Sequence, residues 1–128
     1  MPLVTLTLRK PAPPGLARRI LDEVHAALVA AGVPATDRFQ RVLELEPDAF
    51  VVDPRYPDLT RDRAARFALV EIVWSVGRSV NVKRKLAADL AGRVARAAGT
   101  ATEDVMLVFV ETAWENWAFA GGRLLHAG

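Results

Sequence analysis

The sequence predicts a single α/β (α+β) domain in which tandem β-α-β repeats form a four-stranded mixed sheet with two helices on one face. Its 128 residues, 52% hydrophobic and 25% charged, are typical of one folded domain with its own core. A shift of 66 residues brings Leu3-Val4 onto Leu69-Val70, which indicates an internal repeat. Each half, about 2–46 and 67–111, has the pattern of strand, helix and strand. We therefore expect one domain over residues 1–128.

The first half begins with Leu3–Leu8, where β-branched and aliphatic residues alternate as they do in strands. Pro13-Pro14-Gly15 interrupts this pattern, and a helix is expected to follow until Gly32 and Pro34 end it. Phe39–Leu45 is expected to be the second strand. The helix is predicted from apolar residues at three- and four-residue steps, namely Leu16, Ile20, Val24, Ala27, Leu28 and Ala31.

The second half begins with Phe67–Trp74, a nearly continuous apolar run. Such a strand fits a sheet that is covered on both faces, or on one face plus a subunit interface. Ser79 can cap a helix over Val80–Ala98, and Gly99 can close it. Val105–Val110 is expected to be the last strand.

The segment between the halves, Glu46–Arg66, is polar and rich in turn-forming residues. Within it we expect Phe50–Val52 to form a short strand. Each β-α-β unit makes a parallel strand pair, so two units place both helices on one sheet face. The other face needs a cover, and for so small a chain a symmetric oligomer is expected.

Composition also restricts the function classes. The net charge is only +2 and the basic residues are scattered, which disfavours nucleic acid and weakly favours small anions. We expect the short basic groups Arg18-Arg19 and Lys83-Arg84-Lys85 to be solvated helix faces. The chain has no cysteine, no metal-ligand spacing and no apolar run long enough for a membrane span. We therefore expect a cytoplasmic protein without a metal and without nucleic-acid or membrane partners.

Pro2 is the first candidate for chemistry. Removal of Met1 would expose a secondary amine at the start of a strand. A partly buried amine near a cation holds its proton less tightly and can act as a base near neutral pH. Many proteins begin with Met-Pro, so this signal is weak by itself. The residue equivalent to Pro2 in the second repeat is Ala68, which lies inside the chain. Each subunit therefore has one such amine.

Three further segments carry candidate side chains, each with a simpler alternative. Gly77-Arg78-Ser79 lies at a helix start, where Arg78 can clamp a carboxylate; an ordinary turn with a solvated arginine is the alternative. Asp37 precedes the second strand and is either a site acid or a turn residue paired locally. Asn116–Gly122 is rich in aromatics and glycine, and it forms either an apolar pocket wall or a packed C-terminal flap.

Together these residues resemble the tautomerase superfamily, and most closely its malonate semialdehyde decarboxylase branch. Pro2 stands where the family has its catalytic N-terminal proline. Asp37-Arg38-Phe39-Gln40 is similar to the segment that supplies an acidic residue to the site of that branch. Gly77-Arg78-Ser79 followed by Lys83 resembles its arginine-bearing loop, and Trp117-Ala118-Phe119 resembles its aromatic pocket wall. The resemblance covers essentially the whole chain.

The resemblance implies the tautomerase (MIF-like) fold, a homotrimer with active sites near subunit boundaries, and no cofactor. It also implies a small anionic carboxylate as substrate. One position departs from the pattern. The decarboxylase branch has two arginines separated by one residue, and here Val76 stands at the first position while Arg78 matches the second.

The leading hypothesis from this resemblance is keto–enol tautomerisation of a small 2-oxo or enol acid. In it, Pro2 moves the proton, Arg78 holds the carboxylate, and Asp37 orients the amine or a water. Trp117 and Phe119 exclude water from a pocket that Val76 also lines. The alternatives are a decarboxylase or hydratase of a small 3-oxo acid, and a non-catalytic trimeric binding protein.

Overall fold

The computed structural model describes residues 2–125, and no helix within that part is long and apolar enough to cross a membrane. The described residues form four strands and two α-helices in the order β1, α1, β2, β3, α2, β4. Their bounds are β1 Leu3–Arg9, α1 Leu16–Ala30, β2 Phe39–Leu45, β3 Ala68–Ser75, α2 Val80–Ala98 and β4 Val105–Thr112.

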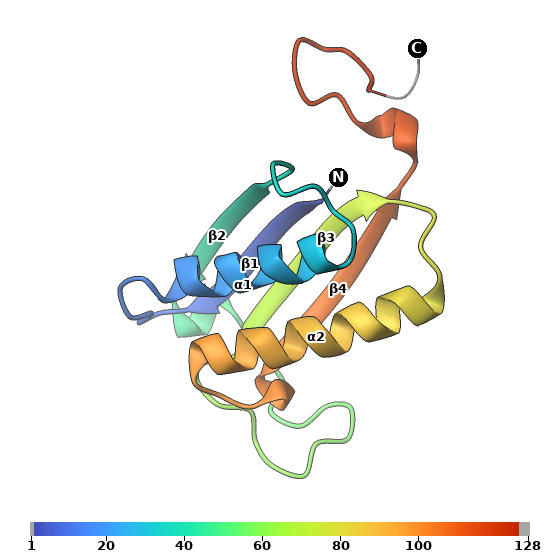
Figure 1. Ribbon diagram of the computed structural model, residues 1–128. Helices are drawn as coiled ribbons and strands as arrows, with labels where there is room; N and C mark the ends of the chain where they lie inside the picture. The colour runs from blue at the N-terminus through green and yellow to red at the C-terminus, as the bar shows by residue number, and fades with distance from the viewer. Residues whose placement is uncertain (1, 126–128) are drawn as a thin grey trace.

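The strands form one mixed sheet in the order β2-β1-β3-β4. β1 is parallel to β2, β3 is parallel to β4, and the two halves join through the antiparallel pair β1–β3. Figure 1 shows α1 and α2 side by side across the same face of the sheet. This arrangement confirms the predicted fold class of two β-α-β units with both helices on one face.

The hydrophobic core lies between the sheet and this helix layer. Strand alternation turns every second residue of β1 and β3 toward the helices, where the apolar stripes of α1 and α2 meet them. The fully buried members with the largest side chains are Val4, Leu6, Ile20, Val24, Leu28, Val70, Ile72, Trp74, Leu90 and Val94.

The predicted helix ends of the second half are also confirmed. The Ser79 hydroxyl accepts a hydrogen bond from the Val82 N–H at 3.2 Å, so it caps the first turn of α2. Gly99 ends the helix with φ 68°, a left-handed conformation that glycine adopts without steric cost.

Four strand predictions need correction. β1 continues one residue further than expected, to Arg9. β3 begins and ends one residue later than the apolar run suggests, and β4 continues to Thr112, because Ser75 pairs with Thr112. The predicted strand Phe50–Val52 is wrong, since these residues form a loop. Arg9 donates two hydrogen bonds from its guanidinium to the Phe50 carbonyl, at 2.8 and 3.0 Å, and the Phe50 ring packs on Phe67. Side-chain contacts therefore hold this segment where a strand ladder was expected.

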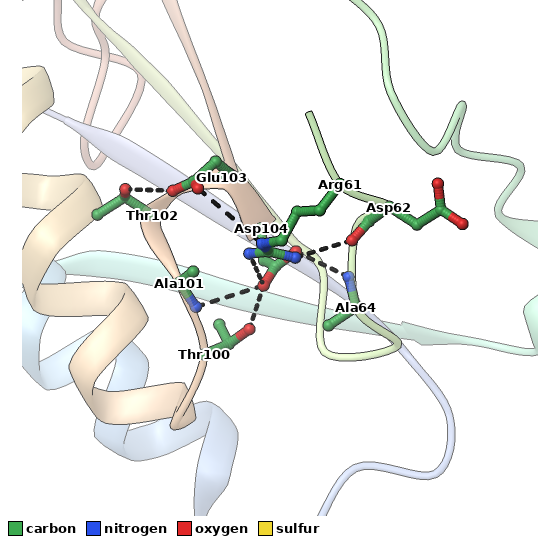
Figure 2. A network of polar contacts seen from close by, with 8 residues as sticks. All are labelled: Arg61, Asp62, Ala64, Thr100, Ala101, Thr102, Glu103 and Asp104. Atoms are coloured by element: carbon green, nitrogen blue, oxygen red, sulfur yellow. Dashed lines mark hydrogen bonds and ion pairs between the residues drawn. The ribbon is translucent and has the colours of Figure 1, made fainter. Parts of the chain in front are cut away.

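The loop between the halves is anchored to the turn before β4 by the buried carboxylate of Asp104 (Figure 2). Asp104 accepts hydrogen bonds from the backbone N–H groups of Ala64 and Ala101, at 2.8 and 3.3 Å, and from the Thr100 hydroxyl. Arg61 adds an ion pair at 3.1 Å. Burial raises the pKa of Asp104, but the hydrogen bonds outweigh it and lower the pKa to about 2.

We predict that this carboxylate makes folding stability dependent on acid pH. A folded-state pKa below the unfolded value contributes stability above about pH 4, and that stability is lost as pH falls toward 2. Asp104→Asn should therefore remove about 2 kcal/mol of the wild-type decline in unfolding free energy between pH 5 and pH 2. Urea unfolding of both proteins at several pH values measures this decline. Glu44→Gln, on an exposed carboxylate of β2, is the control; equal pH dependence in wild type and Asp104→Asn would contradict the prediction.

Candidate active site

The candidate residues gather at the end of the sheet where β1 begins. Leu3, the first residue of β1, pairs with Phe39 at the start of β2 and with Val73 near the end of β3. Pro2 lies one residue further out and is buried. The ends of β3 and β4 lie at this same sheet end, beside the N-terminal end of the described chain (Figure 1). The loop to α2 and the C-terminal segment leave the sheet here.

Arg78 is held over the indole of Trp74. Its guanidinium carbon lies 3.9 Å from the Trp74 ring centroid, a favourable cation–π distance. Its Nη1 donates to the Ser75 carbonyl at 2.8 Å. Trp74 is fully buried and stacks on Phe109, with ring centroids 5.2 Å apart. The arginine therefore has a defined position on a rigid aromatic base, which is more order than a solvated turn arginine would have.

The charged groups around Arg78 leave its guanidinium available to bind one anionic ligand. Burial lowers the pKa of Arg78, and the nearby Glu111 acts in the opposite direction; the guanidinium remains charged. Glu111 is itself paired with Lys83, whose Nζ lies 2.7 Å from its carboxylate oxygen. Among the described residues, Arg78 has no carboxylate within ion-pair distance, so this positive charge is open to a ligand.

Val76 contributes backbone contacts and an apolar side chain. Its N–H donates to the Thr112 carbonyl at 2.9 Å, and its carbonyl accepts from the Trp114 indole N–H at 3.1 Å. The side chain is 42% exposed. Val76 therefore lies at the rim of the candidate site, close to Arg78 in the chain, and supplies no charge.

Asp37 and Arg38 precede β2 and have different surroundings. Asp37 is half-buried, and its N–H donates to the Pro34 carbonyl at 3.0 Å in the turn that enters the strand. The Arg38 side chain turns to the helix layer, where it contacts Asp22 at 2.5 Å and Gln40 at 2.8 Å. Arg38 thus ties β2 to α1.

The C-terminal aromatic residues lie on the β2 side of this sheet end. Trp117 and Phe119 stack with ring centroids 5.3 Å apart, and Phe119 lies 5.5 Å from Phe39. The Leu125 N–H donates to the Trp117 carbonyl at 3.0 Å and closes the segment on itself. These rings and Asp37 lie on the β2 side, Val76 and Arg78 on the β3 side, and β1 with Pro2 runs between them.

Unpaired polar atoms also concentrate here. Four buried side-chain nitrogen or oxygen atoms of residues 2–125 have no hydrogen-bond partner, and three of them belong to Trp74, Ser75 and Trp117. Buried polar groups are nearly always paired, so such exceptions are expected where a ligand or a reaction uses them. This observation marks the same sheet end as the candidate residues do.

Sequence patterns alone did not identify Trp74, Glu111 or Phe39 as site residues. Trp74 belonged to an apolar strand, where an aromatic residue is ordinary. Its spacing of four residues from Arg78 is the only signal for the stacking. Glu111 follows the apolar part of β4. An acidic residue at the end of an apolar strand could have been recognised from the sequence as a candidate site residue.

Comparison with known proteins identifies the family of this chain. The sequence pattern of a protein family described as "Tautomerase enzyme" matches residues 37–120, more than half of the chain. The chain belongs to this tautomerase family. It is therefore an enzyme of the tautomerase superfamily, as the resemblance implied. Family membership argues against the third alternative from the sequence, a non-catalytic binding protein.

Individual relatives cover nearly the whole chain. The protein is 26% identical to the probable tautomerase YusQ of Bacillus subtilis (strain 168), over 96% of both chains. It is 29% identical to malonate semialdehyde decarboxylase, a structure described as the basis for that enzyme's decarboxylase and hydratase activities. That match covers 95% of this chain and 93% of the other, with a TM-score of 0.86. A fused 4-OT symmetric trimer shares the fold at 21% identity and TM-score 0.78, over 95% and 94% of the two chains.

We predict that the C-terminal segment depends on Phe119. Phe119→Ala removes the ring contacts to Phe39 and Trp117, each worth about 0.5–1.5 kcal/mol. Amide hydrogen exchange over residues 114–125 should become faster, while exchange in β1 and β3 stays unchanged. Leu124→Ala, at a half-exposed side chain of the same segment, is the control. Unchanged exchange in Phe119→Ala would show that other contacts hold the segment.

Proposed function

We propose that this enzyme catalyses keto–enol tautomerisation of a small 2-oxo or enol acid, with Pro2 as the proton carrier. The observation that supports this most is that Pro2 opens a central strand at the sheet end that also carries Arg78. Pro2 is buried, and a buried secondary amine at the same sheet end as a fixed cation is expected to hold its proton less tightly and to act as a base. Membership of the tautomerase family supports this reaction class.

Each remaining candidate takes a role that suits its surroundings. Arg78 binds the substrate carboxylate and stabilises the enolate charge that forms when a proton leaves carbon. Asp37, half-buried beside β2, orients the amine or a water. Trp117 and Phe119 keep water away from the reacting carbon, and Val76 adds an apolar rim. The reaction is an isomerisation in which one proton moves between oxygen and carbon, so these residues suffice without a cofactor.

A homotrimer is part of this proposal. The sheet face opposite the helices carries exposed apolar side chains, including Phe39, Leu43, Met106 and Val110. A solved protein with the same fold is described as a symmetric trimer. Burial of this face against other copies would place the site near a subunit boundary.

Decarboxylation or hydration of a small 3-oxo acid is the second candidate. It is favoured by 29% identity to malonate semialdehyde decarboxylase over nearly the whole chain. In that case Pro2 stays protonated and polarises a carbonyl, with Asp37 assisting. It ranks second because Val76 supplies no cation and Lys83, the next cation in the chain, is neutralised by Glu111 at 2.7 Å. One free positive charge suits an enol acid with one carboxylate.

The test of reaction class is a comparison of two substrates. We expect the protein to accelerate ketonisation of phenylenolpyruvate, followed by ultraviolet absorbance, and to show weak or no release of CO2 from malonate semialdehyde. Pro2→Ala should lower kcat/KM for phenylenolpyruvate sharply, because a primary amine in another conformation replaces the ring amine. Efficient decarboxylation without tautomerisation would reverse the ranking of the two candidates.

The free amine requires removal of Met1, which lies outside the described residues. Intact-mass analysis of native protein should find a chain lighter by one methionine, about 131 Da. With Met1 retained, the Pro2 nitrogen is a tertiary amide without a basic lone pair. Full-length mass together with undiminished activity would therefore exclude Pro2 as the base.

We predict that Arg78→Ala lowers kcat/KM for an acidic substrate by about 10- to 100-fold, because a charge-assisted contact is worth roughly 1.5–3 kcal/mol. Arg78→Lys should recover part of the loss, since it keeps the charge but not the bidentate geometry. Arg84→Ala is the control, because Arg84 is exposed on α2 and bonds to Asn81. An unchanged kcat/KM in a folded Arg78→Ala variant would leave Arg78 as an ordinary turn residue.

A further inference from the structure

The sheet face opposite the helices has a definite chemical pattern. Three rows of its side chains run across all four strands, as the register shows. The two outer rows consist of Phe39, Leu3, Val73 and Val110, and of Leu43, Thr7, Leu69 and Met106. Apart from Thr7 they are apolar, and several of their members are more than 40% exposed. So large an apolar area on one face indicates an interface.

The middle row carries two opposite charges. It runs from Arg41 on β2 through Thr5 on β1 and Glu71 on β3 to Val108 on β4. Arg41 and Glu71 are two strands apart, a backbone separation of about 10 Å. The Arg41 backbone therefore lies on the edge strand β2 and its guanidinium reaches over β1, while Glu71 lies on the next strand, β3; both charges stand between apolar rows.

Neither charge is neutralised within the described chain. Arg41 donates from Nε to the Thr5 hydroxyl at 2.8 Å, which fixes the guanidinium and leaves its two terminal nitrogens without a partner among residues 2–125. Glu71 is half-buried and makes no hydrogen bond or ion pair with a described residue. Burying either charge without a partner would be costly.

We propose that the middle row sets the register of self-assembly, with Arg41 of one copy paired to Glu71 of the next. The occupant of the open face is a second copy of this chain, because Arg41 and Glu71 of the same face complement each other. In a ring, each copy gives Arg41 to one neighbour and Glu71 to the other, so every charge is paired. The apolar rows supply affinity, and the charge pair excludes shifted arrangements. This inference rests on the proposed assembly and not on the proposed reaction.

The test is charge reversal followed by analytical ultracentrifugation. Arg41→Glu places two carboxylates opposite each other, and Glu71→Arg places two cations opposite each other. Each single variant should weaken assembly at least tenfold in Kd. The double variant Arg41→Glu/Glu71→Arg restores the pair in the opposite sense and should recover most of the loss.

Matched controls separate this effect from a general charge effect. Arg19→Glu on α1 and Asp58→Arg in the linker change exposed charges by the same amounts, and both should assemble like wild type. If a reversal variant fails to fold by circular dichroism, Arg41→Gln and Glu71→Gln replace it in a double-mutant cycle, which should show positive coupling.

Three results would overturn the inference: a monomeric wild type at micromolar concentration, reversal variants that assemble like wild type, or a double variant no better than the single ones. Ultracentrifugation needs no substrate. An assembled but inactive wild type would therefore count against the proposed reaction alone, and an active monomer against the assembly alone.

Discussion

The antiparallel pairing of β1 with β3 is the constraint on which the rest of this structure depends. Each β-α-β unit contributes only two parallel strands, and the two central strands join the units through their backbone ladder. Antiparallel pairing places the start of β1 beside the end of β3. As a result Pro2 lies at the sheet end from which the chain leaves toward Arg78 and α2. The site is thus a consequence of strand direction.

The two faces of the sheet differ in how their side chains are covered. Its helix face is closed within the chain, where α1 and α2 cover β1 and β3 and the buried side chains form one core. Its other face is apolar at the outer rows and charged in the middle row. Permanent exposure of such an apolar face to solvent is unfavourable. Association of copies through this face would therefore add to the stability of the folded subunit.

Local electrostatics are arranged differently at the two ends of the sheet. Asp104, far from Pro2, is surrounded by donors and by Arg61, and it serves to hold the linker. Arg78, at the sheet end where Pro2 lies, rests on an aromatic ring with no carboxylate partner among the described residues. A satisfied charge stabilises the fold, whereas an unsatisfied one keeps its capacity to bind a ligand.

The sequence by itself determined the elements and their order, because strand alternation, helical periodicity, the Ser79 cap and the Gly99 stop are local signals. It also indicated the candidate residues Pro2, Asp37 and Arg78 through short motifs.

Only the tertiary structure decided what surrounds them. The stacking of Arg78 on Trp74, the pairing of Lys83 with Glu111 and the contact of Phe119 with Phe39 join residues from separate elements. Phe50–Val52 failed as a predicted strand for the same reason: its carbonyl partner is the Arg9 side chain, 41 residues away. Periodicity reports which face a residue occupies, but the neighbour that it meets there depends on how the strands pair and the chain ends fold back.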